Sequence, residues 1–211
     1  MGIAERKERE KTKRKNDIVD AAEKLFFTKG FINTAMDEIA AEAELSKGTL
    51  YLYFKSKEDL YLAINHRGLS ILEKMFKSAS LKGENGLAKT YNIGQAYFEF
   101  SNKYPNYFNA MIYYESHDID LDLHESSAQS CEEQGQRVLA VVASAIEQGI
   151  SDESIRADID PMDAATVLWA HSTGVIMILA LRGQHLNDKH NVNVNDVIDL
   201  SFEMTKRALK K

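Results

Sequence analysis

The sequence is poor in cysteine and proline, and each shortage excludes a class of protein. Its 211 residues include one cysteine and two prolines. A single cysteine cannot form an internal disulfide and provides no metal-ligand spacing, so the chain is not a disulfide-stabilised secreted domain. With so few prolines, long stretches of helix-favouring residues run uninterrupted. We therefore expect an all-α protein of the cytoplasm, with Cys131 as a small core residue.

Long apolar runs are also scarce. The N-terminus is charged and does not resemble a secretory signal. Residues 164–181 form an uncharged run that reaches the lower edge of membrane-spanning length. His171, Ser172 and Thr173 lie at its middle and make a bilayer a poor environment for it. We expect a buried core or interface helix there, and no membrane partner.

Signatures of catalysis are missing as well. The sequence contains no nucleophile elbow, glycine-rich phosphate loop, paired zinc ligands or recognisable triad, so we expect no enzymatic activity, no catalytic residue and no cofactor. An enzyme with an accessory head is the alternative, and it would return its ligand chemically changed. The segment HDIDLDLHE superficially suggests a metal site, but its spacing matches no strong pattern and favours an acidic solvated loop. Its polar residues are His117, Asp118, Asp120, Asp122 and His124.

The formal net charge of −6 argues at first against nucleic acid, because DNA binding depends on Lys and Arg that neutralise phosphates. The distribution of charge changes this conclusion. Residues 1–60 hold twelve basic and twelve acidic side chains, so the net negative charge belongs to residues 61–211. Residues 1–15 alone contain seven basic and three acidic side chains. Basic charge is therefore concentrated in the N-terminal arm.

Three short helical patterns follow the arm. Apolar residues between Ile18 and Phe26 recur at the three-and-four spacing of one helical face, and Gly30 follows as a C-terminal cap. Thr34 precedes Asp37 by three residues and predicts the capped start of a second helix. Ser46 then predicts the cap of a third.

The remaining patterns predict a helical body. Ser56 and Asp59 open a fourth helix that runs to about Ser80 and joins head to body. Further helical patterns cover roughly residues 86–102, 105–115, 124–149, 161–182 and 193–209. Prolines stand where first helical turns tolerate them and glycines just past predicted helix ends: Pro105, Pro161, Gly149 and Gly183. The expected architecture has about nine helices, with a helix-turn-helix head at 1–60 and a ligand-binding and dimerisation body at 61–211.

The second and third helices have the features of a DNA-reading pair. Two short helices joined by about three residues can cross so that the second enters the major groove. Its first turn would present two hydroxyls, one cation and a residue without a side chain: Ser46, Lys47, Gly48 and Thr49. Gly48 costs about 1 kcal/mol of helix stability relative to alanine, which a close approach to DNA would explain. Leu50 or a neighbour is expected to pack on a thymine methyl group.

The end of this helix adds phosphate contacts. Tyr51 and Tyr53 have hydroxyls that can donate to phosphate oxygens. Lys55 and Lys57 flank the start of the fourth helix, where free N–H groups and the helix dipole also favour a phosphate. Phe54 is expected in the core of the head.

These residues resemble the DNA-binding head of the tetracycline-repressor (TetR) family. The matching elements are a first helix ending FFTKGF, the second helix TAMDEIA, the recognition helix SKGTLYLYF and the fourth-helix start KSKEDL, about a quarter of the chain. The resemblance implies DNA-contacting roles for Thr34, Ser46, Lys47, Thr49, Tyr51, Tyr53 and Lys57. One position departs from the family. Glu44 stands where the turn often has glycine, so we expect a strained or differently shaped turn.

The resemblance also implies how the whole molecule works. One recognition helix touches few base pairs, so we expect a homodimer on a palindromic double-stranded DNA operator. Family members pair through their last two long helices, here 161–182 and 193–209. We expect a repressor released by a small-molecule effector. Activation, or a body that is a protein-interaction scaffold without an effector, remains an alternative.

The body is rich in aromatic residues, with nine in the 24 positions of 91–114. Aromatic and methionine side chains commonly line small-molecule pockets, although each one taken singly is more often core. His171 is likewise expected to be a satisfied core histidine. The candidate effector-binding residues are Tyr97, Tyr107, Met111, Tyr114, Trp169 and Thr173.

Overall fold

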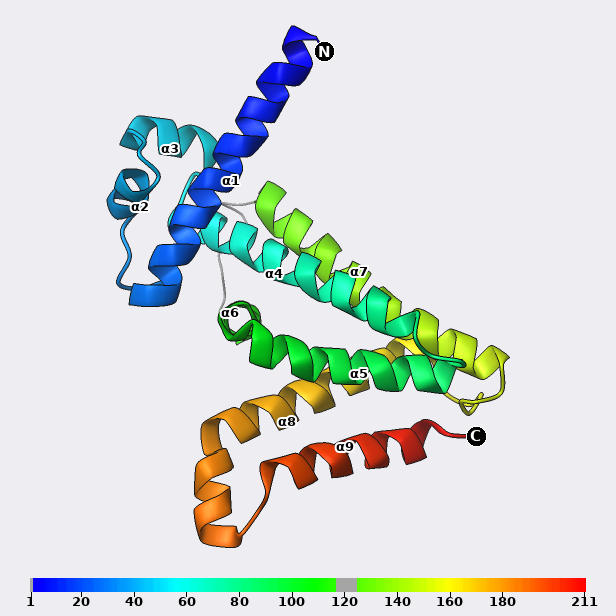
Figure 1. Ribbon diagram of the computed structural model, residues 1–211. Helices are drawn as coiled ribbons and strands as arrows, with labels where there is room; N and C mark the ends of the chain where they lie inside the picture. Colours follow the sequence, from blue (N-terminus) through cyan, green and yellow to red (C-terminus); the bar gives the residue numbers. More distant parts are fainter. Residues whose placement is uncertain (1, 117–124) are drawn as a thin grey trace. The chain divides into compact units, whose positions relative to one another are not determined.

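The computed structural model describes residues 2–116 and 125–211, and these form nine helices (Figure 1). The all-helical expectation is thereby confirmed. The acidic segment from His117 to His124 lies outside the described residues. The helices are α1 (Ile3–Lys29), α2 (Met36–Glu42), α3 (Lys47–Tyr53), α4 (Lys57–Ser80), α5 (Gly86–Lys103), α6 (Pro105–Ser116), α7 (Glu125–Ser151), α8 (Pro161–His190) and α9 (Val194–Leu209).

The predicted starts of four helices are confirmed. Pro105 and Pro161 are the first residues of α6 and α8. Ser46 precedes α3, and its Oγ accepts a hydrogen bond from the N–H of Thr49 at 3.2 Å. Ser56 precedes α4 and accepts in the same way from the third residue of that helix, at 3.2 Å. The arm is not a separate segment, because α1 begins at Ile3 and continues through it.

Two predicted helix ends are wrong. The seventh helix continues past Gly149 to Ser151, and the eighth continues past Gly183 to His190. Both glycines allow close packing rather than ending a helix. A Cβ at Gly149 would lie 2.5 Å from the Ile155 side chain, and one at Gly183 would lie 3.1 Å from that of Val194. The sequence correctly marked the two glycines as special positions. The physical reason for them is close contact with the next segment of the chain.

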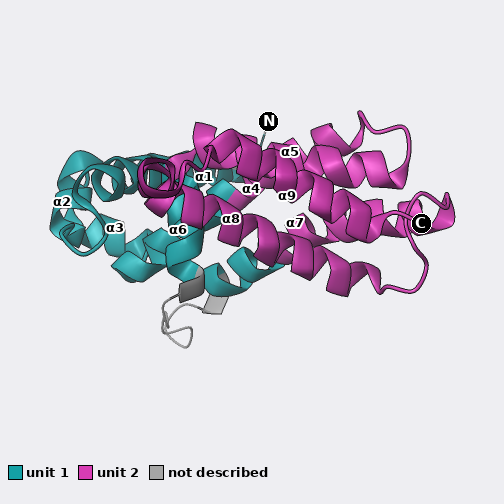
Figure 2. Ribbon diagram, turned by 90° about the horizontal axis from the view of Figure 1, so that it is seen from below, with its two compact units in different colours: residues 1–68, 106–133 teal, residues 69–105, 134–211 magenta. Residues whose placement is uncertain are grey.

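Contacts divide the chain into two compact units (Figure 2). Unit 1 comprises Met1–Gly68 and Asn106–Glu133, and unit 2 comprises Leu69–Pro105 and Gln134–Lys211. This division differs from the sequence boundary after residue 60. Most of α6 and the beginning of α7 group with the N-terminal helices.

The core of unit 1 joins α1, α2, α3, the start of α4 and α6. Leu50 of α3 and Phe54 after it are fully buried in this core. Tyr61 of α4 donates a hydrogen bond to the carbonyl of Ala110 in α6 at 3.0 Å, and its ring packs 5.4 Å from that of Tyr113. Burial raises the pKa of Tyr61 above its ordinary range. Cys131 is buried as expected.

The core of unit 2 is formed where α5 packs against α8 and α9. Phe202 of α9 lies 5.3 Å from the ring of Phe98 in α5. His171 of α8 is half-buried and pairs with the hydroxyl of Ser201 at 2.9 Å, so its ring has a partner within the unit, although that partner is a hydroxyl and not the carbonyl expected for a core histidine.

Helix α8 is long and apolar enough to cross a membrane by length and composition. Only 11% of its apolar 18-residue window is buried within the chain. The expectation of a core helix is therefore wrong for the single chain. Its exposed apolar surface includes Val167, Ile178 and Leu181.

Candidate nucleic-acid interface

Helix α3 is anchored on one side and exposed on the other. Leu50 and Phe54 hold it to the core of unit 1, one turn apart. Lys47, Gly48, Tyr51 and Leu52 are exposed on its outer side. The helix therefore presents a cation, a backbone patch, a phenol and an apolar side chain to any partner.

Leu50 cannot contact a thymine methyl group, because its side chain is 0% exposed. The prediction is therefore wrong for Leu50 and remains a prediction for its neighbours. Leu52, two positions on, is 78% exposed and is the apolar side chain on the outer face. The spacing of Leu50 and Phe54 already placed both on one face, and Leu52 lies off that face.

Gly48 has no packing reason inside the described residues. A Cβ at this position would meet nothing within 4 Å. Alanine would favour the helix by up to about 1 kcal/mol, so the glycine is unexplained by the chain's own stability. A partner that approaches the backbone closely would explain it.

The lysines of the interface have weak internal partners that a phosphate can replace. Lys47 Nζ lies 2.7 Å from Asp37 Oδ1, and the hydrogen bond to Asp37 raises the pKa of Lys47. Both side chains are largely exposed, and such a surface pair contributes little to stability. Lys55 Nζ donates to the carbonyl of Tyr51 at 3.3 Å, and Lys57 Nζ donates to the carbonyl of Ile32 at 3.3 Å.

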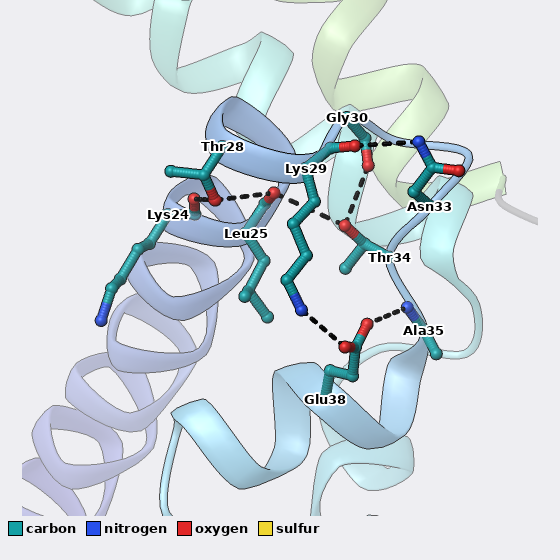
Figure 3. A network of polar contacts seen from close by, with 9 residues as sticks. All are labelled: Lys24, Leu25, Thr28, Lys29, Gly30, Asn33, Thr34, Ala35 and Glu38. Carbon is teal, nitrogen blue, oxygen red and sulfur yellow. Dashed lines mark hydrogen bonds and ion pairs between the residues drawn. The ribbon is translucent and has the colours of Figure 1, made fainter.

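Thr34 is part of the interior rather than a helix cap (Figure 3). Its hydroxyl donates to the carbonyl of Gly30 at 2.9 Å, so its one proton is used at the end of α1. The cap of α2 is Ala35, whose N–H donates to Glu38 Oε2 at 3.0 Å. The hydrogen bond from Lys29 then lowers the pKa of Glu38. The predicted cap is wrong, and a buried hydroxyl does not support the phosphate contact that the resemblance implied.

The turn between α2 and α3 is strained at Glu44, which is one of the two outcomes expected for it. Its φ of 54° lies in the left-handed region that disfavours side chains with a Cβ. The N–H of the next residue, Leu45, closes the turn by donating to the carbonyl of Ala40 at 2.8 Å. The departure from glycine therefore changes strain, while the turn itself forms.

The six candidate effector-binding residues do not form one cluster. Tyr107 and Tyr114 pack against the core of unit 1, and Met111 is buried in the same unit. Tyr97 and Thr173 are joined by a hydrogen bond of 2.9 Å in unit 2. For Tyr107 and Tyr114 the packing explanation replaces the pocket prediction, and Trp169 is partly exposed on α8.

Sequence reasoning missed a charged cluster that ties α6 to α1 and α4. Tyr107 donates to Glu23 Oε1 at 2.6 Å, and Arg67 Nη1 lies 3.0 Å from Glu23 Oε2 and 2.6 Å from Asp20 Oδ1. Burial, and then the bond to Glu23, raise the pKa of Tyr107. Partial burial opposes the charge of Arg67, but the hydrogen bond to Asp20 and the nearby Glu23 raise its pKa overall. The apolar spacing of α1 indicated that one face of this helix packs against other helices, and it was the only sequence signal for this contact.

Residues 18–64 match the family model described as bacterial regulatory proteins, tetR family. The chain is 41% identical over 70 residues to the HTH-type transcriptional regulator YfiR of Bacillus subtilis, and this match covers 33% of the chain and 34% of YfiR. It is 31% identical over 146 residues to the HTH-type transcriptional regulator YhgD of the same species, covering 68% of the chain and 72% of YhgD.

Solved structures share the fold over most of the chain. The transcriptional regulator FadR from Bacillus subtilis, in complex with stearoyl-CoA, has a TM-score of 0.71 and 16% identity. That comparison covers 91% of this chain and 97% of the other. The similarity therefore extends beyond the helix-turn-helix to the arrangement of the remaining helices.

Proposed function

The chain belongs to the tetR family of bacterial regulatory proteins, and on this premise we propose that it is a cytoplasmic homodimeric repressor released from a palindromic operator by a small-molecule effector. Members of the family are DNA-binding transcriptional regulators rather than enzymes. The outward face of α3 is the observation that carries the proposal. The proposed DNA contacts come from α3 and the residues that flank it: Ser46, Lys47, Gly48, Thr49, Tyr51, Leu52, Tyr53, Lys55 and Lys57.

Lys47 gives the sharpest test of this interface. DNA fragments selected by the wild-type protein from its source genome would be sequenced and used as the operator. Lys47→Ala should weaken binding about tenfold and reduce the slope of log affinity against log salt concentration by about 1. Lys24→Ala is the matched control, because Lys24 is an exposed lysine paired with Glu42 at 2.6 Å elsewhere in unit 1. Equal effects of the two variants would contradict the groove assignment.

The proposed dimer interface is the exposed face of α8 together with α9. Val167, Gly174, Ile178 and Leu181 follow one another at spacings of seven, four and three, which places them on one face. A Cβ at Gly174 would meet nothing within 4 Å, so another helix can approach closely there. A two-fold axis brings identical apolar faces together and matches a palindromic operator. Helix α9 falls within the predicted range 193–209, whereas α8 starts at the predicted residue 161 and continues beyond residue 182 to His190.

We assign the effector to unit 2, with Tyr97 and Thr173 as its polar contacts. Acyl-CoA esters are the first compounds to test, because a protein of the same fold was solved with stearoyl-CoA. Stearoyl-CoA should lower operator affinity where free coenzyme A does not. The size of this effect is limited by the difference between its affinities for the operator-binding and the released conformations of the protein. Operator affinity that no tested ester changes would favour the scaffold alternative.

A further inference from the structure

Four cations of α1 continue the face by which this helix packs on the core of unit 1. Ile18 is the first fully buried residue of that face. Lys7, Lys11, Arg14 and Lys15 precede it by eleven, seven, four and three positions. At 3.6 residues per turn, the first three lie within about 40° of the direction of Ile18 and Lys15 within about 60°. We call these four residues the basic stripe.

The acidic residues of the same segment lie elsewhere on the helix. Glu5, Glu8, Glu10 and Asp17 are turned by about 80° or more from the direction of Ile18. Glu10 is bound to Arg6 at 2.9 Å on that other side. Lys7, Lys11 and Arg14 form no ion pair with any residue in the described part of the chain, and residues 4–17 are exposed throughout. These three cations of the stripe therefore carry positive charge that no ion pair within the described residues neutralises.

The stripe begins beside the recognition helix. Lys15 Nζ lies 5.4 Å from the ring centre of Phe54, which follows the last residue of α3. From there α1 projects past α3, as Figure 1 shows. The twelve residues back to Ile3 extend about 18 Å, a length of duplex DNA that carries about ten phosphates on its two strands.

We propose that the basic stripe binds the phosphate backbone of DNA that flanks the segment held by α3. The inference rests on the proposed function and extends its interface. A rigid helical face with cations one turn apart matches a backbone that runs on past the recognition helix. The stripe would then lengthen the protected operator and add to its salt dependence without reading any base.

An anionic membrane is the other polyanionic surface that such a helix might meet, and the sequence of α1 argues against it. Helices that lie in a membrane interface bury a broad apolar face. Between residues 4 and 17 the only apolar side chain is that of Ala4. Charge without an apolar face favours DNA.

Two triple variants of equal charge test the proposal. The stripe variant carries Lys7→Gln, Lys11→Gln and Arg14→Gln. The control variant carries Arg6→Gln, Arg9→Gln and Lys13→Gln on the opposite face, and both lose three positive charges. Glutamine keeps helix propensity, which circular dichroism would verify. Affinity for fragments selected by the wild-type protein is measured against salt, on the full fragment and on one trimmed to the bases nearest α3.

The stripe variant should reduce the salt slope on the full fragment by more than about two, because each lost phosphate contact is worth about 0.9. The control should change it by less than about one, and trimming should remove the difference between them. Equal salt slopes for the stripe variant and the control variant would refute DNA binding by the basic stripe and leave the proposed function standing. Failure of the wild-type protein to select any DNA would overturn the proposed function with it. Binding of wild type but not the stripe variant to phosphatidylserine vesicles, with equal DNA slopes, would assign the stripe to membranes instead.

Discussion

At the scale of the residue, the head contains one strained position and one unexplained glycine, and the two have opposite origins. Glu44 has a φ of 54°, a conformation that suits glycine better. Gly48 lies in a helix where nothing within 4 Å prevents a side chain. The strain at Glu44 lowers the stability of the chain itself. The helix stability lost at Gly48 can be offset only by contact with a partner.

Replacing Glu44 should therefore stabilise the protein only when the new residue is glycine. We expect the free energy of unfolding of Glu44→Gly to exceed that of Glu44→Ala by about 1 kcal/mol. Both variants lose the carboxylate, and only glycine relieves the strain of the left-handed conformation. Urea denaturation of the two variants measures the difference. Equal midpoints and slopes would show that the turn carries no strain.

Gly48→Ala should separate folding from binding. The substitution adds helix propensity worth up to about 1 kcal/mol and meets no atom of the chain, so the free energy of unfolding should rise. Operator affinity should fall at least about tenfold, because the methyl group stands where the backbone approaches DNA. Gly135→Ala is the control, since a Cβ there also meets nothing within 4 Å and α7 carries no proposed DNA contact. A variant of Gly48 that binds as tightly as wild type would refute the close approach.

The sequence predicted the polar signals of the head better than the direction of its side chains. The cap at Ser46 was predictable because the chemistry of a cap is local. The burial of Leu50 and Thr34 depends on which helices pack around them. That information comes from contacts distant in the sequence, and a single motif does not contain it.

At the scale of the element, α6 is held to α1 and α4 by polar contacts that helical spacing does not reveal. Tyr107 and Arg67 both reach Glu23 of α1. A Cβ at Gly68 would lie 3.0 Å from the Tyr107 ring, so α4 and α6 cross closely there. Tyr107, Tyr113 and Tyr114 thus pack against the core of the N-terminal unit.

Tyr107→Phe should loosen α6 while leaving its ring packing intact. We expect the free energy of unfolding to fall by about 1.5 kcal/mol, because a hydrogen bond to a carboxylate is lost and Glu23 keeps only Arg67. Tyr104→Phe, which removes a tyrosine hydroxyl three residues earlier in the sequence, is the comparison variant. Faster hydrogen exchange of α6 amides should accompany the loss, and unchanged exchange would show that this bond does not restrain the helix.

Alkaline pH should unfold unit 1 through its tyrosines. The pKa values of Tyr61 and Tyr107 are raised above the ordinary value of 10.0 in the folded state. The unfolded chain therefore releases these protons first, so stability is full below about pH 10 and falls as the pH rises further. Unfolding free energies measured across this range should fall less steeply for a Tyr61→Phe, Tyr107→Phe double variant. A slope equal to that of wild type would contradict the assignment.

At the scale of the whole molecule, the exposed face of α8 is the surface on which the proposed dimer depends. Leu181 is 74% exposed and Val167 is 65% exposed, although both lie in an apolar run. The sequence predicted a helix that had to be covered, but a single chain could not specify what covers it. The nine helices of residues 2–116 and 125–211 were predictable from periodicity, whereas the grouping of α6 with the head was not.

Leu181→Glu should dissociate the proposed dimer. A carboxylate on the two-fold face would be desolvated against its own symmetry copy, at a cost of several kcal/mol. Leu81→Glu is the control, because Leu81 is 86% exposed in the turn after α4. Equilibrium sedimentation at micromolar concentration should find dimer for wild type and control, and monomer for Leu181→Glu. Wild type that sediments as monomer, or that requires detergent to remain in solution, would refute the pairing.

The continuity of α1 has a mechanical consequence. A helix of 27 residues is about 40 Å long, and it is fixed at its C-terminal half by the core of unit 1. The part of α1 before Ile18 is about 22 Å long, so a tilt of about 9° displaces the free end by about 3.5 Å, close to the axial step between successive phosphates of one strand. If the basic stripe binds DNA as proposed, a rotation of the head by this amount would move the tip of α1 out of register with the phosphates.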